Sequence, residues 1–379
     1  MTVLRYVFSL FLGVGMLSLV IPAHADQAES EFYFGVDLSY VNEMEDCGAV
    51  YRVDGDPHDP FELFADYGAT LVRARLWHDP DWTDYSTLDD VRRTFRRARD
   101  AGMQTLLNFH YSDTWADPGH QAIPRAWATI TDTSELAAAV YEYTYAVLLD
   151  LHTDDLTPAF VQVGNETNAG LLKRGGVPTL DWPRDAQLFN AGIRAVRDFG
   201  AATGTAPQII LHVAQPENTD WWFREAEQAG ITDYDVIGIS YYAQWSRFSI
   251  DELGQQVQRL RNHFGKAVMI VETAYGWTRD AANETAHNIL GTAIPGYPFT
   301  PSGQRRYMTD LTQTLIDSGA LGVIYWEPAW VSTPCSTPWG QGSHWENATF
   351  FDFRDGNALL EGIAYMRHDY RLPEDATGR

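Results

Sequence analysis

The sequence predicts a single-domain α/β protein with the (β/α)8 TIM-barrel fold. Eight short runs of β-branched and apolar residues recur along the 379-residue chain and alternate with helical patterns. Such alternation predicts parallel strands joined by right-handed crossovers, and eight units in roughly 350 residues close into a barrel. The alternative, an open doubly wound sheet, would need a Gly-rich phosphate turn, and the chain contains neither G-x-G-x-x-G nor a P-loop sequence.

The predicted strands come first in each repeat, and helical stretches follow most of them. The strands span Phe32–Ser39, Leu71–Leu76, Thr105–Tyr111, Phe160–Gly164, Ile209–Ala214, Val236–Tyr242, Val268–Thr273 and Gly322–Trp326. The helices include Leu88–Ala101, Glu135–Leu149, Ala186–Phe199, Trp221–Ala229, Asp251–Phe264 and Gln304–Asp317. Gly102, Gly230 and Gly265 follow three of these helices directly, which is typical of helix C-termini.

The N-terminus has the pattern of a cleavable export signal. Arg5 precedes an uncharged apolar run from Tyr6 to Ile21, and the small-residue pattern Ala23-His24-Ala25 follows. The apolar run is short for a membrane span, so a retained anchor is the weaker alternative. We therefore expect residues 1–25 to be removed, leaving a barrel domain of residues 26–379 that is secreted or periplasmic and free of the membrane.

Charge and cysteine content restrict the partners and the cross-links of the chain. The 51 acidic residues outnumber the 27 basic ones, for a formal net charge of −24. This charge disfavours nucleic acid and anionic membranes, whereas a neutral polysaccharide is indifferent to it. Cys47 and Cys335 follow the first and last predicted strands, which are neighbours in a closed barrel. Export would allow a disulfide between them, and two buried thiols are the alternative.

Polar residues collect where the predicted strands end, and strand C-termini form the active face of a TIM barrel. Glu166 ends the fourth strand and Glu272 the seventh, so the two carboxylates would face each other across the barrel mouth. Glycoside hydrolysis uses such a pair, and a separation of about 5–5.5 Å predicts retention of configuration. The candidate substrate-binding residues are Asp37, Arg75, His110, Asp113, Trp115, Asn165, Tyr242, Trp326 and Trp330.

The surroundings of the two glutamates predict different roles for them. Glu272 ends an apolar strand, where an arginine such as Arg75 could hold it as a carboxylate, as a nucleophile requires. Glu166 follows Asn165, whose amide could bind a sugar hydroxyl beside the scissile bond, so Glu166 is the predicted acid/base. His110 and Tyr242 would orient these acids or bind sugar, or else are hydrogen-bonded core residues.

Tryptophans are frequent at the predicted strand ends. Sugar rings pack their C–H faces on aromatic planes, so this row predicts a cleft for several sugar units, with about half of the rings packing loops instead. The tryptophans at these positions are Trp77, Trp115, Trp245, Trp277, Trp326 and Trp330. No H-E-x-x-H or Cys-x-x-Cys sequence is present, and we expect no catalytic metal and no cofactor. Oxygen ligands in Asp280–Asn288 would suit a structural Ca²⁺, although a solvated loop is the simpler interpretation.

Several longer runs resemble those of one enzyme family. They are FYFGVDLSYVNEMEDCG, LVRARLWHDP, NFHYSDTWADPGHQ, IPRAW, VQVGNETNAGLL, IGISYY, VMIVETAYGWT, GYPFTPSGQ and VIYWEPAW. In this order they resemble the arabinogalactan endo-β-1,4-galactanases, family 53 of the glycoside hydrolases, from about Phe32 to about Asp352. The resemblance implies a retaining barrel with Glu166 as acid/base and Glu272 as nucleophile, which cleaves internal bonds of β-1,4-galactan, the neutral side chain of pectin.

The chain departs from that family at two places. Ala243-Gln244 stands where many members carry a Pro and an aromatic residue, and His120 stands where a lysine is frequent. Two other functions remain as alternatives: a retaining endo-glycanase acting on mannan, xylan or glucan, and a non-catalytic polysaccharide-binding protein of the cell envelope. Because such a barrel needs no partner to be stable, we expect a monomer.

Overall fold

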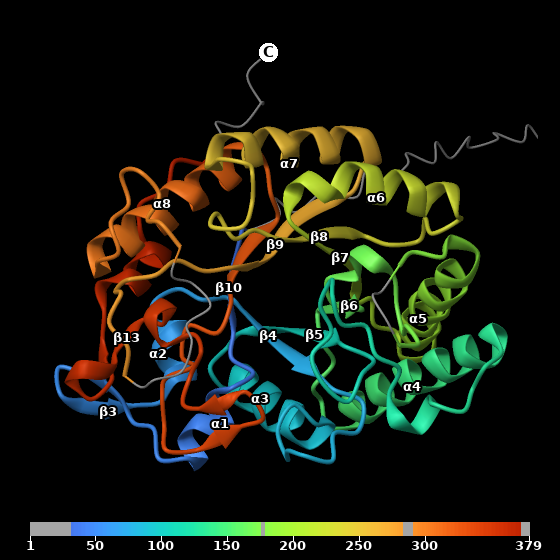
Figure 1. Cartoon of the computed structure of the whole chain (residues 1–379), viewed down its shortest axis with the longest axis horizontal. Helices are drawn as coiled ribbons and strands as arrows, with labels where there is room; N and C mark the ends of the chain where they lie inside the picture. Colours follow the sequence, from blue (N-terminus) through green and yellow to red (C-terminus); the bar gives the residue numbers. More distant parts are fainter. Residues whose placement is uncertain (1–31, 176–178, 283–290, 373–379) are drawn as a thin grey trace, which may run out of the picture. The chain divides into compact units, whose positions relative to one another are not determined.

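The computed structural model describes residues 32–175, 179–282 and 291–372, so the predicted export signal lies outside the described residues. Eight parallel strands form a closed barrel in the order β1-β10-β9-β8-β7-β6-β5-β4 (Figure 1). They are β1 (Tyr33–Asp37), β4 (Leu71–Leu76), β5 (Gln104–Phe109), β6 (Phe160–Val163), β7 (Gln208–Ala214), β8 (Val236–Ser240), β9 (Ala267–Thr273) and β10 (Gly322–Tyr325). The predicted fold and all eight predicted strands are confirmed.

Helices lie outside the barrel and connect its strands. They are α1 (Val41–Asp46), α2 (Pro60–Asp66), α3 (Leu88–Asp100), α4 (Thr133–Thr153), α5 (Trp182–Thr203), α6 (Pro216–Gln228), α7 (Ile250–Phe264) and α8 (Pro301–Asp317). Several begin earlier than predicted because a polar residue caps the first turn. Asp132 accepts hydrogen bonds from the first turn of α4, and Ser249 and Glu252 form a capping box on α7.

The inner face of the barrel changes from apolar to polar along the strands. Alternate residues of a strand share one face, so Leu71 and Arg73 on β4 both point inward, as do Phe160 and Gln162 on β6. The apolar members close the end of the barrel at which the strands begin. They are Leu71, Leu106, Phe160, Ile210, Val236, Met269, Val271 and Ile324. The polar residues are thereby confined to the other end, beneath the strand C-termini.

Smaller elements add to the barrel and were not predicted. One four-stranded sheet combines β2 (Tyr51–Val53), β3 (Asp56–His58), β13 (Phe351–Asp352) and β14 (Ala358–Leu359), and a hairpin joins β11 (Ser336–Thr337) to β12 (Gly340–Gln341). Short 3-10 helices span Arg125–Trp127, Thr167–Ala169, Glu346–Ala348, Phe353–Asp355 and Glu361–Arg367. In the described part of the chain, every helix is too short or too polar to cross a bilayer.

A disulfide joins Cys47, directly after α1, to Cys335, directly before β11, with 5.9 Å between their Cα atoms. From the sequence, a disulfide and two buried free thiols were both possible for this pair. The bridge connects residues 288 positions apart and fixes the long segment after β10 to the first βα unit.

Removing this bridge with Cys47→Ala and Cys335→Ala together is expected to lower the free energy of unfolding by about 2–5 kcal/mol, because the cross-link restricts the unfolded chain. Guanidinium denaturation of the variant and the wild type, each with and without dithiothreitol, measures this difference. The reductant should lower the wild-type midpoint and leave the variant unchanged. Equal midpoints for oxidised wild type and variant would contradict a stabilising bridge.

Candidate active site

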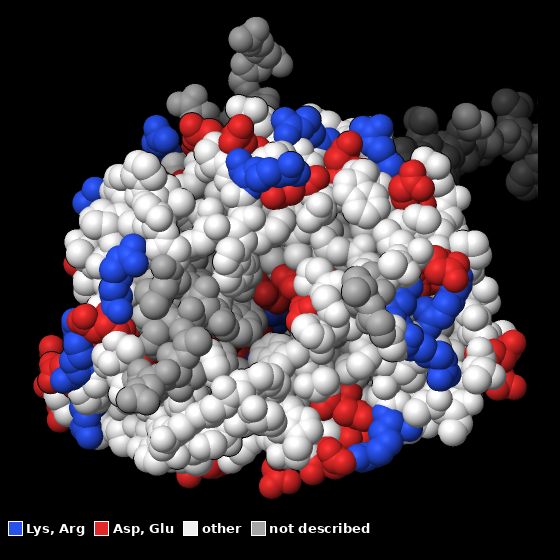
Figure 2. All heavy atoms as spheres, in the orientation of Figure 1, with Lys and Arg blue, Asp and Glu red and all other residues white. Residues whose placement is uncertain are grey.

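A cleft opens at the C-terminal ends of the barrel strands. Figure 2 shows acidic side chains in the hollow at the centre of this face. The cavity has a volume of about 330 Å³, and its polar lining includes Asn165, Glu166, Tyr242 and Glu272. Tryptophans form most of the remaining wall. They are Trp115, Trp245, Trp326, Trp330, Trp339 and Trp345, with Ala116, Asp117 and His344 between them.

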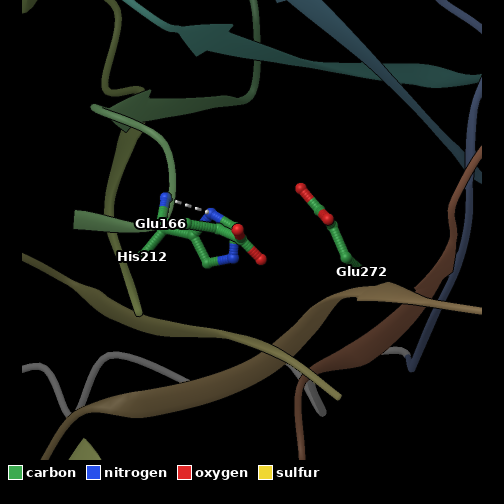
Figure 3. Close-up of side chains that lie close together, drawn as sticks. All are labelled: Glu166, His212 and Glu272. Atoms are coloured by element: carbon green, nitrogen blue, oxygen red, sulfur yellow. Dashed lines mark hydrogen bonds between the residues drawn. The ribbon is translucent and has the colours of Figure 1, made fainter. Parts of the chain in front are cut away.

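Glu166 and Glu272 face each other in this cleft (Figure 3), and a carboxylate oxygen of one lies within 4.8 Å of a carboxylate oxygen of the other. Glu166 follows β6 and has a left-handed backbone, with φ at +45°. A non-glycine residue rarely adopts this conformation, and such strain is concentrated at functional sites. The turn directs the side chain back over the barrel mouth instead of along the strand.

A bulge in β9 brings Glu272 to the inner face. The residue pairs between β8 and β9 shift from Ile239 with Ile270 to Ser240 with Glu272, so β9 contains one extra residue. Met269 and Val271 already point inward, and strict alternation would therefore turn Glu272 outward. The extra residue reverses this, in keeping with the tendency of bulges near active sites to re-aim a side chain.

Glu272 has a hydrogen-bond donor on each carboxylate oxygen. Arg73 Nη2 donates to Oε1 at 2.8 Å, and the Tyr242 hydroxyl donates to Oε2 at 3.0 Å. Arg73 also pairs with Asp37 at 2.8 Å and is 1% exposed. Burial raises the pKa of Glu272, and the positive charge of Arg73 opposes this rise most strongly. Glu272 is therefore the carboxyl group of the pair that has a cation in contact to stabilise its ionised form.

Glu166 lacks such a counterion. The ion pairs formed among the described residues include none with Glu166. Burial raises its pKa to about 8, and the neighbouring charge of Glu272 adds to the rise, while the Ser240 hydroxyl, which donates to Oε1 at 2.6 Å, opposes it. The two environments therefore favour a protonated Glu166 beside an ionised Glu272 at neutral pH, the division of roles that acid and nucleophile require.

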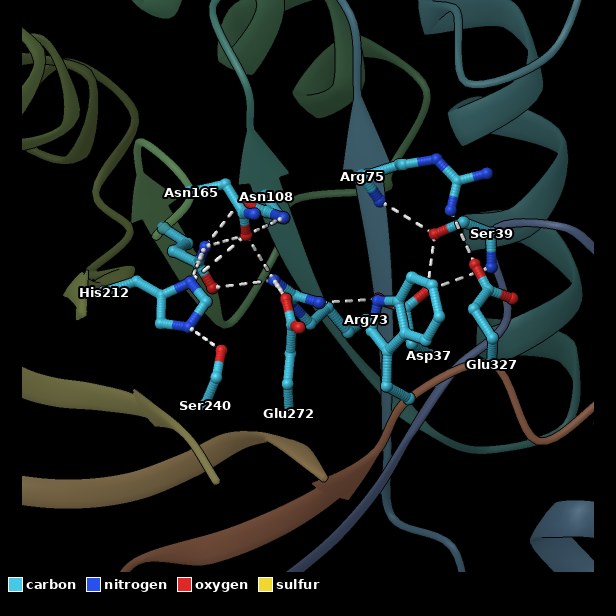
Figure 4. Close-up of polar contacts among 12 residues, drawn as sticks. Asp37, Ser39, Arg73, Arg75, Asn108, Asn165, His212, Ser240, Glu272 and Glu327 are labelled. Atoms are coloured by element: carbon cyan, nitrogen blue, oxygen red, sulfur yellow. Dashed lines mark hydrogen bonds and ion pairs between the residues drawn. The ribbon is translucent and has the colours of Figure 1, made fainter. Parts of the chain in front are cut away.

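The prediction that Arg75 holds Glu272 is wrong, because Arg73 does so. Arg75 lies two residues after Arg73, nearer the C-terminal end of β4, and its Nη1 donates to Glu327 Oε1 at 2.6 Å (Figure 4). Its guanidinium lies 4.0 Å from the ring centre of Tyr40 and 4.5 Å from that of Trp115. Arg75 is 2% exposed and does not line the cleft. It contacts the aromatic wall of the cleft from behind, and its role in substrate binding stays a prediction.

Three further candidates lie below or beside the cleft. Asp37 is 1% exposed and pairs with Arg73. His110 is buried, and its Nδ1 accepts the backbone N–H of Ala116 at 3.0 Å. Asp113 accepts the backbone N–H of Arg125 at 2.7 Å. None of the three lines the cleft; their contacts are with its floor and loops, and their part in substrate binding stays a prediction. The predicted residues that do line it are Trp115, Asn165, Tyr242, Trp326 and Trp330.

Several residues of the site were missed in the sequence. Three of them are Arg73, Gln162 and His212, which point inward like the apolar residues that close the other end of the barrel. The alternation of residues along each strand could therefore have identified them as inward-facing. Trp339 and Trp345 come from the long segment after β10, which carries no comparable local signal. Of the six tryptophans predicted at strand ends, Trp77 and Trp277 do not line the cleft. Both are 1% exposed, which matches the packing role expected for part of the six.

Glu166, His212 and Glu272 also have the spacing of a metal site, with one ligand atom of each within 4.8 Å of the others. However, His212 Nδ1 already accepts the backbone N–H of Glu166 at 3.2 Å, and Arg73 supplies a positive charge to Glu272. The donor set therefore suits acid–base chemistry. Of the calcium ligands predicted in Asp280–Asn288, Asp280 pairs with Arg354 at 2.8 Å, and residues 283–288 lie outside the described residues.

Known proteins resemble this chain over most of its length. The sequence model of glycosyl hydrolase family 53 matches residues 33–365. An arabinogalactan endo-β-1,4-galactanase of Cellvibrio japonicus is 53% identical over 352 residues, or 91% of this chain and 93% of the relative. An endo-β-1,4-galactanase of Bacillus subtilis is 34% identical over 316 residues, or 79% of this chain and 71% of the relative.

Solved structures agree with the sequence relatives. The family 53 catalytic domain of Ignisphaera aggregans superposes with a TM-score of 0.82 at 30% identity, covering 91% of this chain and 98% of that domain. A fungal β-1,4-galactanase structure gives 0.76 at 27% identity, covering 89% of this chain and 99% of that one. The matching family model, the relatives and the barrel with its paired glutamates lead to one conclusion: this chain belongs to glycosyl hydrolase family 53.

Proposed function

We propose that this chain is an exported, endo-acting, retaining hydrolase that cleaves internal β-1,4-galactosidic bonds of galactan and arabinogalactan. The observation that carries the mechanism is the pair of carboxylates, Glu166 and Glu272, within 4.8 Å of each other in an aromatic cleft. A separation this short suits direct attack, because an inverting pair needs about 6.5–9.5 Å to admit a water molecule. The relatives from Cellvibrio japonicus and Bacillus subtilis support the substrate.

The geometry supports a double displacement. In the first step, Glu166 gives its proton to the glycosidic oxygen as Glu272 attacks the anomeric carbon, which breaks the C–O bond and forms a glycosyl ester on Glu272. In the second step, Glu166, now a carboxylate, takes a proton from water as the water oxygen attacks the anomeric carbon. The ester breaks, Glu272 leaves as a carboxylate, and the product keeps the β-configuration. This chemistry needs no cofactor.

The shape of the cleft supports cleavage inside a polymer. A second cavity of about 330 Å³ shares Trp115, Asp117 and Trp339 with the catalytic cavity, so the trough continues beyond the two glutamates. Aromatic walls of this kind offer faces to successive sugar rings. Ala243 and Gln244, the departure from the family pattern, lie between Tyr242 and Trp245 but do not line the catalytic cavity themselves.

A substrate panel tests this function. The mature protein, residues 26–379, is incubated with debranched β-1,4-galactan, mannan, xylan and β-glucan, and reducing ends and viscosity are followed together. We expect release from galactan alone, with viscosity falling before many reducing ends appear, and with a β-anomer as the first product by proton NMR. Activity on another glycan would overturn the substrate, and an α-anomer would overturn the retaining mechanism.

Export and a monomeric state complete the proposal. Sequencing the N-terminus of the protein recovered from the periplasm or the medium should yield Asp26, because the small-residue pattern ends at Ala25. Light scattering of that protein should give the mass of one chain. Recovery from the membrane fraction with an intact N-terminus would contradict cleavage. A calcium ion in the segment after β9 stays a prediction.

A further inference from the structure

Two buried residues connect to Glu166 from beneath the cleft. Ser240 ends β8, His212 lies on β7, and neither side chain has measurable exposure or lines the catalytic cavity. Ser240 Oγ donates to Glu166 Oε1 at 2.6 Å, and His212 Nε2 lies 2.8 Å from Ser240 Oγ. His212 Nδ1 accepts the backbone N–H of Glu166 at 3.2 Å (Figure 3). Neither side chain can therefore touch a sugar, yet both contact the acid/base.

The direction of each hydrogen bond follows from the donors. A backbone N–H can only donate, and Gln162 Nε2, 2.9 Å away, is also a donor. Asn165 Oδ1, an acceptor 3.1 Å away, already accepts from Arg73 and Asn108, so His212 Nδ1 is the unprotonated nitrogen. The neutral imidazole then carries its proton on Nε2 and donates to Ser240 Oγ. Burial, with the charges of Arg73 and His110, holds the pKa of His212 well below its ordinary value, so this tautomer persists. The one proton of Ser240 is left for Glu166 Oε1.

We propose that Ser240, oriented by His212, is a positioning residue for the acid/base: its hydroxyl keeps Glu166 Oε1 an acceptor, so that the acidic proton sits on Oε2. This inference rests on the role proposed for Glu166. The same hydroxyl strengthens its hydrogen bond when Glu166 loses its proton, because hydrogen bonds to charged groups are the stronger kind. Ser240 thus serves the proton donation of the first step and stabilises the carboxylate that acts as base in the second.

The pH dependence of this arrangement follows from the groups that face Glu166. Glu272 and Asp117 raise its pKa by their negative charges, and Arg73 lowers it from a distance. Tyr242 faces the pair, with its pKa raised so that it stays neutral, and His212 is neutral as well. The hydroxyl of Ser240 is the uncharged donor that opposes the rise. Without it the pKa of Glu166 moves up, and the alkaline limb of kcat/KM, set by loss of the acidic proton, moves up with it.

The experiment compares Ser240→Ala with Ser240→Thr, and His212→Phe with His212→Gln. Thr keeps the hydroxyl, and Gln keeps a donor near the position of Nε2. Each pair therefore distinguishes the effect of losing the hydrogen bond from the effect of changing the side-chain volume. We expect the Ala and Phe variants to shift the alkaline limb upward and lower kcat on galactan by about tenfold to a hundredfold, the effect of losing one hydrogen bond to a charged group. The Thr and Gln variants should restore most of the wild-type kcat and most of the wild-type position of the alkaline limb. Melting temperatures establish that all four variants fold.

A second measurement does not depend on the substrate. Carbon NMR of the protein labelled at the glutamate carboxyl carbons, with Glu166→Gln for assignment, follows the titration of Glu166 directly. An upward pKa shift in Ser240→Ala supports the inference even if no glycan is cut, in which case the proposed function fails and the positioning role stands. An unchanged titration, or activity lost equally at every pH, would make Ser240 a packing residue and overturn the inference.

Discussion

Replacing Glu272 with Gln is expected to reduce kcat on galactan by roughly 10⁴-fold or more, because the carboxylate oxygen that attacks the anomeric carbon is replaced by a neutral amide. The neutral amide keeps the size of the side chain, and Arg73 retains Asp37 as a counterion at 2.8 Å, so the fold should survive. Initial rates of reducing-end release measure the effect. Glu225→Gln, an exposed position on α6, is the matched control and should behave as wild type.

Chemical rescue makes the assignment of the nucleophile specific. In Glu272→Ala, the space left by the side chain admits azide, which attacks an aryl β-galactoside from the face that Glu272 occupied. We expect an α-galactosyl azide, identified by NMR from its anomeric coupling. A β-configured azide, or activity close to that of Glu225→Gln, would sink the assignment of Glu272 as nucleophile.

Replacing Glu166 with Ala is expected to lower kcat on galactan by about 10²- to 10⁴-fold, the usual contribution of a positioned general acid. The first step should be nearly unaffected with a nitrophenyl leaving group, which departs without a proton. The second step still lacks its base, so the glycosyl-enzyme ester should accumulate and appear by mass spectrometry. The contrast between the two substrates is the readout that distinguishes an acid/base from a residue that only packs.

The pH profile provides the second test of Glu166. Its raised pKa of about 8 keeps it protonated at neutral pH, so wild-type kcat/KM should fall as the pH rises through that value. In Glu166→Ala this alkaline limb should disappear, and azide should restore turnover with a β-galactosyl azide as product. If the limb persists in the variant, another group supplies the proton, and the role of Glu166 would have to be reassigned.

The structure relates the different roles proposed for the two glutamates to their neighbours. Arg73 contacts Glu272, whereas the hydrogen bond that stabilises the charged form of Glu166 comes from the neutral hydroxyl of Ser240. Burial raises the pKa of both carboxyls, so the cation decides which of them ionises first. A retaining glycanase acting on mannan, xylan or glucan could share this arrangement. The substrate panel is therefore needed to identify the polysaccharide, which the arrangement of the catalytic residues does not. A binding protein would not need the two environments to differ.

Much of this molecule could be predicted from local sequence. Each barrel strand is a short apolar or β-branched run, the six predicted helices have their own periodicity, and strand ends in a TIM barrel point to one face. Glu166 and Glu272 could therefore be placed at the barrel mouth from the sequence. Contacts between strands that are far apart in the sequence could not be predicted in this way. Arg73 and Arg75 share one face of β4, and only the closed barrel shows that the deeper one reaches Glu272 while Glu327 takes the other.

By itself, the sequence determined the barrel, its eight strands and the two glutamates, because periodicity and strand ends are local properties of the chain. Tertiary structure alone decided how those glutamates are placed and which groups surround them. The bulge in β9 turns Glu272 inward, the left-handed backbone turns Glu166 over the cleft, and the disulfide fixes the segment that carries Trp339. Each of these depends on contacts between residues distant in sequence, and the pKa values follow from the burial that such packing creates.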